Sequence, residues 1–366
     1  MTNTFQRSEL RHRNTVLVLT ELGILAAILM TSWLQAMPFA QTPLPEPQTF
    51  LRKQLAVTTA ELGALETGQI IVRLPKTSET REVAALAIMR LDIPADFFIE
   101  RVRDIVNFKK SDNVLQIGKF SNPPGLEDLA GLTLDLVDIE AIRRCKVNSC
   151  DVKMSAAFIE RFRNEVDWSA PDYRERVTTK VREMLLEYVQ VYSQGGTAAL
   201  GTYNDKSYSL RPEDEIRSIL QPAPYMYEYV PEFQNYLENF PNSRTLDVED
   251  FFYWSKEKFA LKPVISVTHI NIYRLPQPNG TDVLIASKGI YATHYFEASL
   301  GLTGFIHSQS SEPSRSYLIY INRSRADALR GLFAGLKRSL ISGSLRDATK
   351  KNMEMIKQKL ESEYWK

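Results

Sequence analysis

The segment 264–300 reads VISVTHINIYRLPQPNGTDVLIASKGIYATHYFEASL, and it decides the fold class. Apolar and polar residues alternate with a period of two before and after the dipeptide Asn279-Gly280, which is a strong signal for a tight hairpin turn. We therefore predict two antiparallel strands, Val264–Tyr273 and Val283–Leu300.

The register of this hairpin decides which side chains share a face of the sheet. A turn centred on Asn279-Gly280 places His269 opposite Ile290. One face is then apolar with a few polar groups set into it, as in a ligand cavity. The residues expected to line this cavity are His269, Asn271, Lys288, Ile290, His294, Phe296 and Phe333. The alternative is that hydrogen bonds satisfy both histidines and that Lys288 snorkels to solvent.

The period of the apolar residues predicts the other elements. Further strands are expected at 69–74, 82–91, 114–120 and 317–321. Helices are expected at 50–65, from Pro94, between Ser169 and Gly195, and around Pro212 and Pro231. Two helices close the chain: the first carries the apolar stripe Ala326, Leu329, Phe333, Leu336 and Leu340, and the second runs from about Leu345 to Glu361.

This order of elements resembles the START-like, or helix-grip, arrangement of lipid and small-molecule carriers. The resemblance is carried by Glu82–Asp96, which leads into Phe97–Ile105, and by the run Pro263–Leu340. It covers about half of the chain and contains no diagnostic motif. It implies an α+β fold in which a curved antiparallel sheet grips a long C-terminal helix around an apolar cavity. The domain would span 50–366, with a large helical insertion at about 155–260.

The N-terminal residues have the pattern of an export leader. Within residues 1–40, three arginines lie among the first 13 residues, and the apolar run Leu22–Leu34 follows them. This run suits a signal peptide and is shorter than the roughly 20 residues that a bilayer span needs. The alternative is an uncleaved anchor at residues 15–39. Both readings place the domain, after a Pro-rich spacer at 41–49, in the periplasm or the extracellular space.

Cys145 and Cys150 are the two cysteines of the chain. In an oxidising compartment, two close thiols on either side of Asn148-Ser149 indicate a disulfide with a structural role. A metal pair, which would need further ligands nearby, and two unlinked buried thiols are the alternatives.

Charge and motifs exclude several classes of protein. The whole chain has a net charge of +1, and without residues 1–40 the basic and acidic residues balance, so the basic footprint of a nucleic-acid-binding protein is missing. The sequence contains no nucleophile elbow, zinc-protease helix, phosphate-binding loop or dinucleotide fingerprint, and we expect no cofactor and no metal site.

We therefore expect a non-enzymatic binding or carrier protein for an apolar small molecule or lipid. In this hypothesis the C-terminal helix covers the face that bears His269 and His294, and Gly331 and Gly335 leave room for the ligand. One alternative is an enzyme that transfers protons through His269, His294 or Lys288. Another is an interaction module that uses the aromatic-rich segment 225–259. If the segment has no such role, its aromatic residues are expected to pack in the core. The excess of basic residues after Arg323 is either a solvated helix face or a contact with an anionic membrane.

Overall fold

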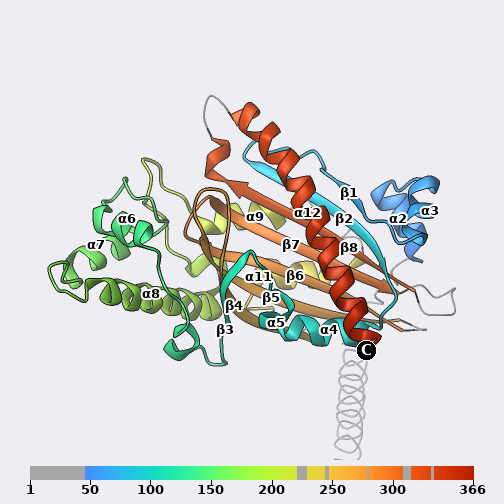
Figure 1. Cartoon of the computed structure of the whole chain (residues 1–366), viewed down its shortest axis with the longest axis horizontal. Coiled ribbons are helices and arrows are strands. Elements are labelled where there is room, and N and C mark those ends of the chain that lie inside the picture. Colours follow the sequence, from blue (N-terminus) through green and yellow to red (C-terminus); the bar gives the residue numbers. More distant parts are fainter. Residues whose placement is uncertain (1–45, 221–228, 244–246, 278–279, 308–314, 331–333) are drawn as a thin grey trace, which may run out of the picture. The chain divides into compact units, whose positions relative to one another are not determined.

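An eight-stranded antiparallel sheet forms the centre of the computed structural model, and it is curved and unclosed (Figure 1). The structure describes residues 46–220, 229–243, 247–277, 280–307, 315–330 and 334–366. The strands lie in the order β1-β2-β8-β7-β6-β5-β4-β3. Their bounds are β1 (Ile71–Arg73), β2 (Glu82–Leu91), β3 (Val114–Lys119), β4 (Val248–Glu257), β5 (Val264–Gln277), β6 (Gly280–Ala292), β7 (Phe296–His307) and β8 (Ser316–Ala326).

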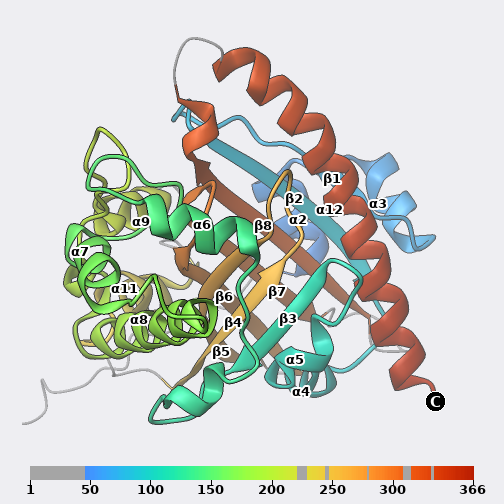
Figure 2. The ribbon, with the colours of Figure 1, turned by 60° about the vertical axis from the view of Figure 1, so that its left-hand side comes forward.

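Helices cover both faces of this sheet (Figure 2). Those that precede β4 are α2 (Pro47–Leu55), α3 (Thr59–Glu66), α4 (Ala95–Arg103), α5 (Ile105–Phe108), α6 (Leu136–Arg144), α7 (Ala156–Glu165), α8 (Tyr173–Gly195), α9 (Pro212–Leu220) and α11 (Pro231–Asn239). The C-terminal helix is α12 (Ala334–Tyr364), and short 3₁₀ turns are η1 (Leu126–Leu129), η2 (Gly196–Ala199) and η3 (Asp327–Leu329).

The two faces of the sheet belong to different hydrophobic cores. Helices α4, α5 and α12 pack on one face, which includes Ile270 and Phe305 and is called the α12 face below. Helices α6 to α9 and α11 pack on the other, which includes Trp254 and Leu300 and is called the insertion face. The pair α2 and α3 also packs on the insertion face, over β2, β7 and β8 at the other end of the sheet. The predicted α+β class, with a curved antiparallel sheet, a long C-terminal helix and a large helical insertion, is confirmed.

The predicted hairpin exists, but its predicted register is wrong. His269 lies opposite Lys288 instead of Ile290, because the two residues between the paired Gln277 and Gly280 are Pro278 and Asn279. A slip of two residues leaves every side chain on its predicted face. Nearer the far end of the hairpin, pairing passes from Thr268–Gly289 to Val267–Tyr291, so Ile290 is the extra residue of a β-bulge.

The predicted position of the C-terminal helix is also wrong. Helix α12 packs on the α12 face through Met353 and Leu360, whereas His269 points to the insertion face. The helix begins at Ala334 and is continuous, and Leu340 on the expected stripe is exposed. Gly335 has open space where a side chain would stand, so it does not make room beneath the helix. Gly331 and Phe333 lie outside the described residues.

Some local boundaries differ from the expected ones. Pro47 belongs to α2 and not to an extended spacer, because proline is accepted in the first helical turn. The stretch expected as one helix at 50–65 is two, since Ala56 is left-handed and Thr58 starts α3 with a capping box. Residues 248–257 form strand β4, and the helical stretch ends before them.

Candidate functional site

His269, Asn271 and Lys288 come together on the insertion face, as the alternation of the hairpin predicts. Strands β5 and β6 place His269 directly opposite Lys288, and Asn271 follows two residues along the same face. The exposed fraction of each residue is 1% or less. Helices α8 and α11 cover them, so these residues form a buried polar cluster beneath the helical insertion.

His269 is held on all sides by the protein. Its Nδ1 lies 3.1 Å from the hydroxyl of Tyr192, and its Nε2 lies 2.9 Å from the side-chain amide of Asn271 and 3.6 Å from a carboxylate oxygen of Asp250. The ring stacks on Phe252 with centroids 4.5 Å apart. Burial lowers the pKa of His269 to about 4, although the carboxylate of Asp250 acts in the opposite direction, so the ring is neutral at physiological pH.

Lys288 has a single hydrogen bond in this cluster. Its Nζ donates to the main-chain carbonyl of Leu237 in α11 over 2.9 Å and lies 5.7 Å from the ring centroid of Tyr192. No carboxylate of the described residues lies within ion-pair distance of it. Burial lowers the pKa of Lys288 to about 7, which leaves much of the amine uncharged at neutral pH. Nearby, Oδ1 of Asn271 is buried and has no hydrogen-bond partner in the described part of the chain.

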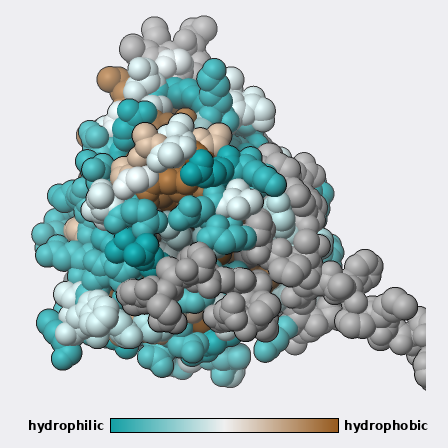
Figure 3. All heavy atoms as spheres, turned by 90° about the vertical axis from the view of Figure 1, so that its right-hand side faces the viewer, coloured by the Kyte–Doolittle hydropathy of each residue, from teal (hydrophilic) through white to brown (hydrophobic). Residues whose placement is uncertain are grey.

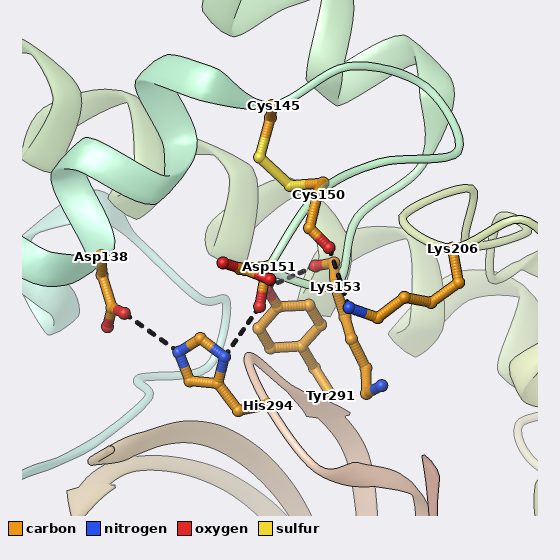
Figure 4. The surroundings of a disulfide bond; sticks show 8 residues. All are labelled: Asp138, Cys145, Cys150, Asp151, Lys153, Lys206, Tyr291 and His294. Carbon is orange, nitrogen blue, oxygen red and sulfur yellow. Dashed lines mark hydrogen bonds and ion pairs between the residues drawn. A yellow bond between two sulfur atoms is a disulfide. The ribbon is translucent and has the colours of Figure 1, made fainter. Parts of the chain in front are cut away.

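The structure separates His294 from this cluster. Strand β6 ends at Ala292, and Tyr295 follows in a left-handed conformation that turns the chain into β7. His294 Nε2 lies 3.0 Å from Asp138 of α6, and Nδ1 lies 2.9 Å from the carbonyl of Asp151 (Figure 4). Both the histidine and Asp138 are buried, so this pair joins α6 to the turn before β7.

The predicted disulfide between Cys145 and Cys150 is confirmed, and it lies next to the His294–Asp138 pair (Figure 4). It closes a short loop after α6 whose two ends are 4.4 Å apart at their Cα atoms. Main-chain hydrogen bonds join this loop to Asn204 and Asp205. The disulfide therefore fixes a loop at the junction of α6 and the sheet, which is a structural role.

The other predicted residues lie elsewhere. Phe296 begins β7 and packs its ring against Phe259, with centroids 4.8 Å apart. Glu297, three residues after His294, forms ion pairs with Arg81 and Arg330 and not with the histidine. Of the predicted cavity residues that the structure describes, three therefore meet in one cluster, and the bulge residue Ile290 lies in the hydrophobic core of the same face.

Sequence reasoning missed an apolar pocket on the insertion face, between the sheet, α2 and α11. It has a volume of about 70 Å³. Residues from both helices and from β6, β7 and β8 line it, among them Phe50, Val230, Phe233, Leu302, Gly304 and Ile319. No residue that lines it is charged, and the hydroxyl of Tyr229 accepts a hydrogen bond from Gln54 over 2.9 Å. The sequence signal for this pocket is the spacing of Leu302, Gly304 and Ile306. They stand at every second position, which places them on one face of a strand.

The surface on the side of α2 and α3 is mainly hydrophilic, and apolar residues gather in a recess there (Figure 3). This is the end of the sheet where α2 forms one wall of the apolar pocket. Helix α11 links the apolar pocket to the polar cluster: Phe233 in its first turn lines the pocket, and Leu237, together with Phe240 just after the helix, covers the polar cluster.

The aromatic-rich segment is mostly internal. Among its described members, Phe233, Tyr236 and Trp254 are buried in the core of the insertion face, whereas Phe259 is exposed. Tyr225 and Tyr227 lie outside the described residues. A broad aromatic surface for a partner is therefore not present on the described part of 225–259.

Comparison with known proteins gave no match to a family model, a curated protein or a solved structure. Among the described residues, no helix is both long and apolar enough to cross a membrane, and no three His, Cys, Asp or Glu side chains are grouped so that they could hold a metal ion.

Proposed function

We propose that this protein binds an apolar small molecule, or the hydrocarbon part of a lipid, in the pocket between α2, α11 and the sheet, without catalysing a reaction. The observation that carries the proposal is the pocket itself: its lining is uncharged and almost entirely aliphatic and aromatic. Such a lining favours a ligand through the loss of water from apolar surface and not through ion pairs. The helix-grip resemblance implies the same class of ligand but a cavity beneath the C-terminal helix.

The enzyme hypothesis finds less support in this geometry. His294 lies in a different place from His269 and Lys288, so the three residues cannot act on one substrate. The side chains of His269 and Lys288 are enclosed by α8 and α11, and a substrate would have to displace these helices to reach them. The polar cluster instead supports α11, which forms a wall of the pocket.

We also propose that the protein works outside the cytoplasm. The leader-like residues 1–40 support this, and a disulfide is more often kept in an oxidising compartment.

Native mass spectrometry of protein purified from its own host, with and without organic extraction, would identify a lipid retained by the protein.

A substitution at Gly304 tests the pocket directly. A Cβ at this position meets only Leu284 at 3.6 Å and Ile306 at 3.9 Å, which are ordinary contact distances, so the backbone accepts a side chain there. We expect Gly304→Leu to fill the pocket and to weaken binding of a fluorescent fatty acid at least about tenfold, which corresponds to about 1.4 kcal/mol. Gly304→Ala should have a smaller effect.

Gly63→Leu is the matched control, because Gly63 is exposed on α3 and has open space around its Cβ position. It should bind the probe as the parent does. Thermal melts of all three variants show whether a loss of binding reflects unfolding. Failure of the parent to bind any apolar probe, or unchanged binding by a folded Gly304→Leu variant, would rule this pocket out.

A further inference from the structure

The turn between β4 and β5 projects two large apolar side chains into solvent. Residues 258–262, which read KFALK, form this turn and are called the hairpin tip below. Leu261 is 95% exposed and Phe259 is 44% exposed. Between them, Ala260 has a φ of 44°, and this left-handed residue turns the chain tightly. No other large apolar residue with a described side chain is as exposed as Leu261.

The tip is held in place from below. The ring of Phe259 packs on Tyr295 and Phe296, with centroids 5.3 and 4.8 Å away. The main-chain N–H of Lys258 donates to Asn113 over 2.8 Å, and that of Lys262 donates to Phe259 over 3.1 Å. The exposed leucine therefore stands on a fixed support, and presenting it costs little further ordering.

More apolar surface lies beside the tip, at the start of α6. Leu136 and Val137 are 55% and 54% exposed. Lys256, two residues before the tip, donates to the carboxylate of Asp135 over 2.7 Å and to the carbonyl of Thr133 over 3.1 Å. These bonds keep the first turn of α6 next to the end of β4, so the exposed aliphatic residues of both elements lie at one end of the sheet.

The charge around the tip is positive. Lys258 and Lys262 flank the apolar residues, and neither forms an ion pair with a described residue. The nearby carboxylates are occupied: Glu257 pairs with Lys109 over 2.7 Å, and Asp135 pairs with Lys256. Lys110 and Asp112, on the neighbouring turn before β3, have opposite charges, so together they add nothing to the net charge of this region. Two basic side chains thus remain on either side of the apolar tip.

We propose that the hairpin tip docks the domain on an anionic lipid bilayer. Phe259 and Leu261 enter the boundary between head groups and acyl chains, and Lys258 and Lys262 contact lipid phosphates. A projecting leucine suits a soft, deformable interface, and lysines with long aliphatic stems reach the head groups from its edge. Each lysine near an anionic surface strengthens the attraction to the bilayer. This site is separate from the apolar pocket and from the basic C-terminal region, and it stands whether or not the pocket binds a ligand.

A fluorescent label at the tip tests the proposal in the full chain. The chain has two cysteines and both are in the disulfide, so Leu261→Cys provides a unique thiol for an environment-sensitive dye. The control label is at Leu340→Cys, which is 69% exposed on α12. Vesicles contain phosphatidylcholine alone or mixed with phosphatidylglycerol, and in a parallel set the acyl chains are brominated to quench a dye that enters them.

We expect a blue shift and severalfold stronger quenching at position 261 than at 340, with the larger effect in vesicles that contain phosphatidylglycerol. Adding Lys258→Glu and Lys262→Glu to the labelled variant should weaken this response at low salt at least about tenfold. Equal quenching at both positions, or none at 261, would overturn the proposal. So would a blue shift that grows with protein concentration and is insensitive to brominated lipid, since this would identify the tip as a contact between two copies of the chain.

Discussion

The amine of Lys288 is buried beneath α11, and among the described residues its hydrogen-bond partner is one main-chain carbonyl. An ammonium group normally needs three acceptors or a nearby carboxylate, and an unpaired charge in this position would be costly. Burial lowers the pKa of Lys288 to about 7, and this keeps the cost down by favouring the neutral amine. At the scale of single residues, the stability of this fold therefore depends on pH.

We predict that stability rises as the pH increases from 7 to 10. In this window the unfolded chain, with an ordinary lysine pKa of 10.5, binds a proton that the folded protein does not hold on Lys288. The free energy of unfolding should gain up to about 1.4 kcal/mol per pH unit from this group. Urea denaturation of Lys288→Met should lack this gain, whereas Lys350→Met, at an exposed lysine of α12, should keep it. Identical pH dependence in Lys288→Met and the parent would contradict the assignment.

At this scale, part of the polar cluster could be predicted and part could not. His269, Asn271 and Lys288 share a face because strand alternation survives a slip of two residues. His294 could not be placed, since the bulge at Ile290 and the left-handed Tyr295 break the alternation. The acceptor for Lys288 is a main-chain carbonyl of a helix distant in the sequence. Every residue has such a carbonyl, so the sequence cannot show which one accepts the hydrogen bond.

At the scale of elements, α12 shows why an apolar stripe is not enough to position a helix. Both faces of β5 are apolar, with Val267 and Tyr273 on the insertion face and Ile270 and Ile272 on the α12 face. Apolar content therefore could not show which face the C-terminal helix covers. The helix is anchored by its second half, where Met353 and Leu360 are buried.

We predict opposite outcomes for two leucines of this helix. Leu360 is fully buried, so Leu360→Ala should cost about 2 to 4 kcal/mol through lost contacts and a cavity. Leu340 is exposed, so Leu340→Ala should change the free energy of unfolding by less than about 0.5 kcal/mol. Urea denaturation of both variants measures the difference. Similar costs would mean that the first half of α12 also packs on the domain.

At the scale of the whole domain, one sheet is shared by all three cores. Strand β2 contributes Ala87 and Met89 to the α12 face, and Leu86 and Ile88 to the core beneath α2 and α3. Strands β4 to β7 likewise have side chains in the cores of both faces. If the strands of one core unfold, side chains are therefore also removed from another core.

We therefore predict that the domain unfolds in a single thermal transition despite its size. In scanning calorimetry, the calorimetric enthalpy should equal the van't Hoff enthalpy, which is the test of two-state unfolding. Two resolved transitions, or a calorimetric enthalpy well above the van't Hoff value, would show that the helical insertion melts separately from the sheet.

The order of strands in the sheet also determines when the domain can fold. In the described sheet, strand β2 lies between β1 and β8, and β3 pairs with β4. The early strands thus remain at the two edges until β4 to β8 have been synthesised and placed between them. Contacts between such distant parts of a chain form slowly. Nearly all of residues 46–366 must therefore leave the ribosome before a stable sheet exists, so the newly made chain carries unpaired strand edges for longer than a chain whose strands pair in the order of synthesis.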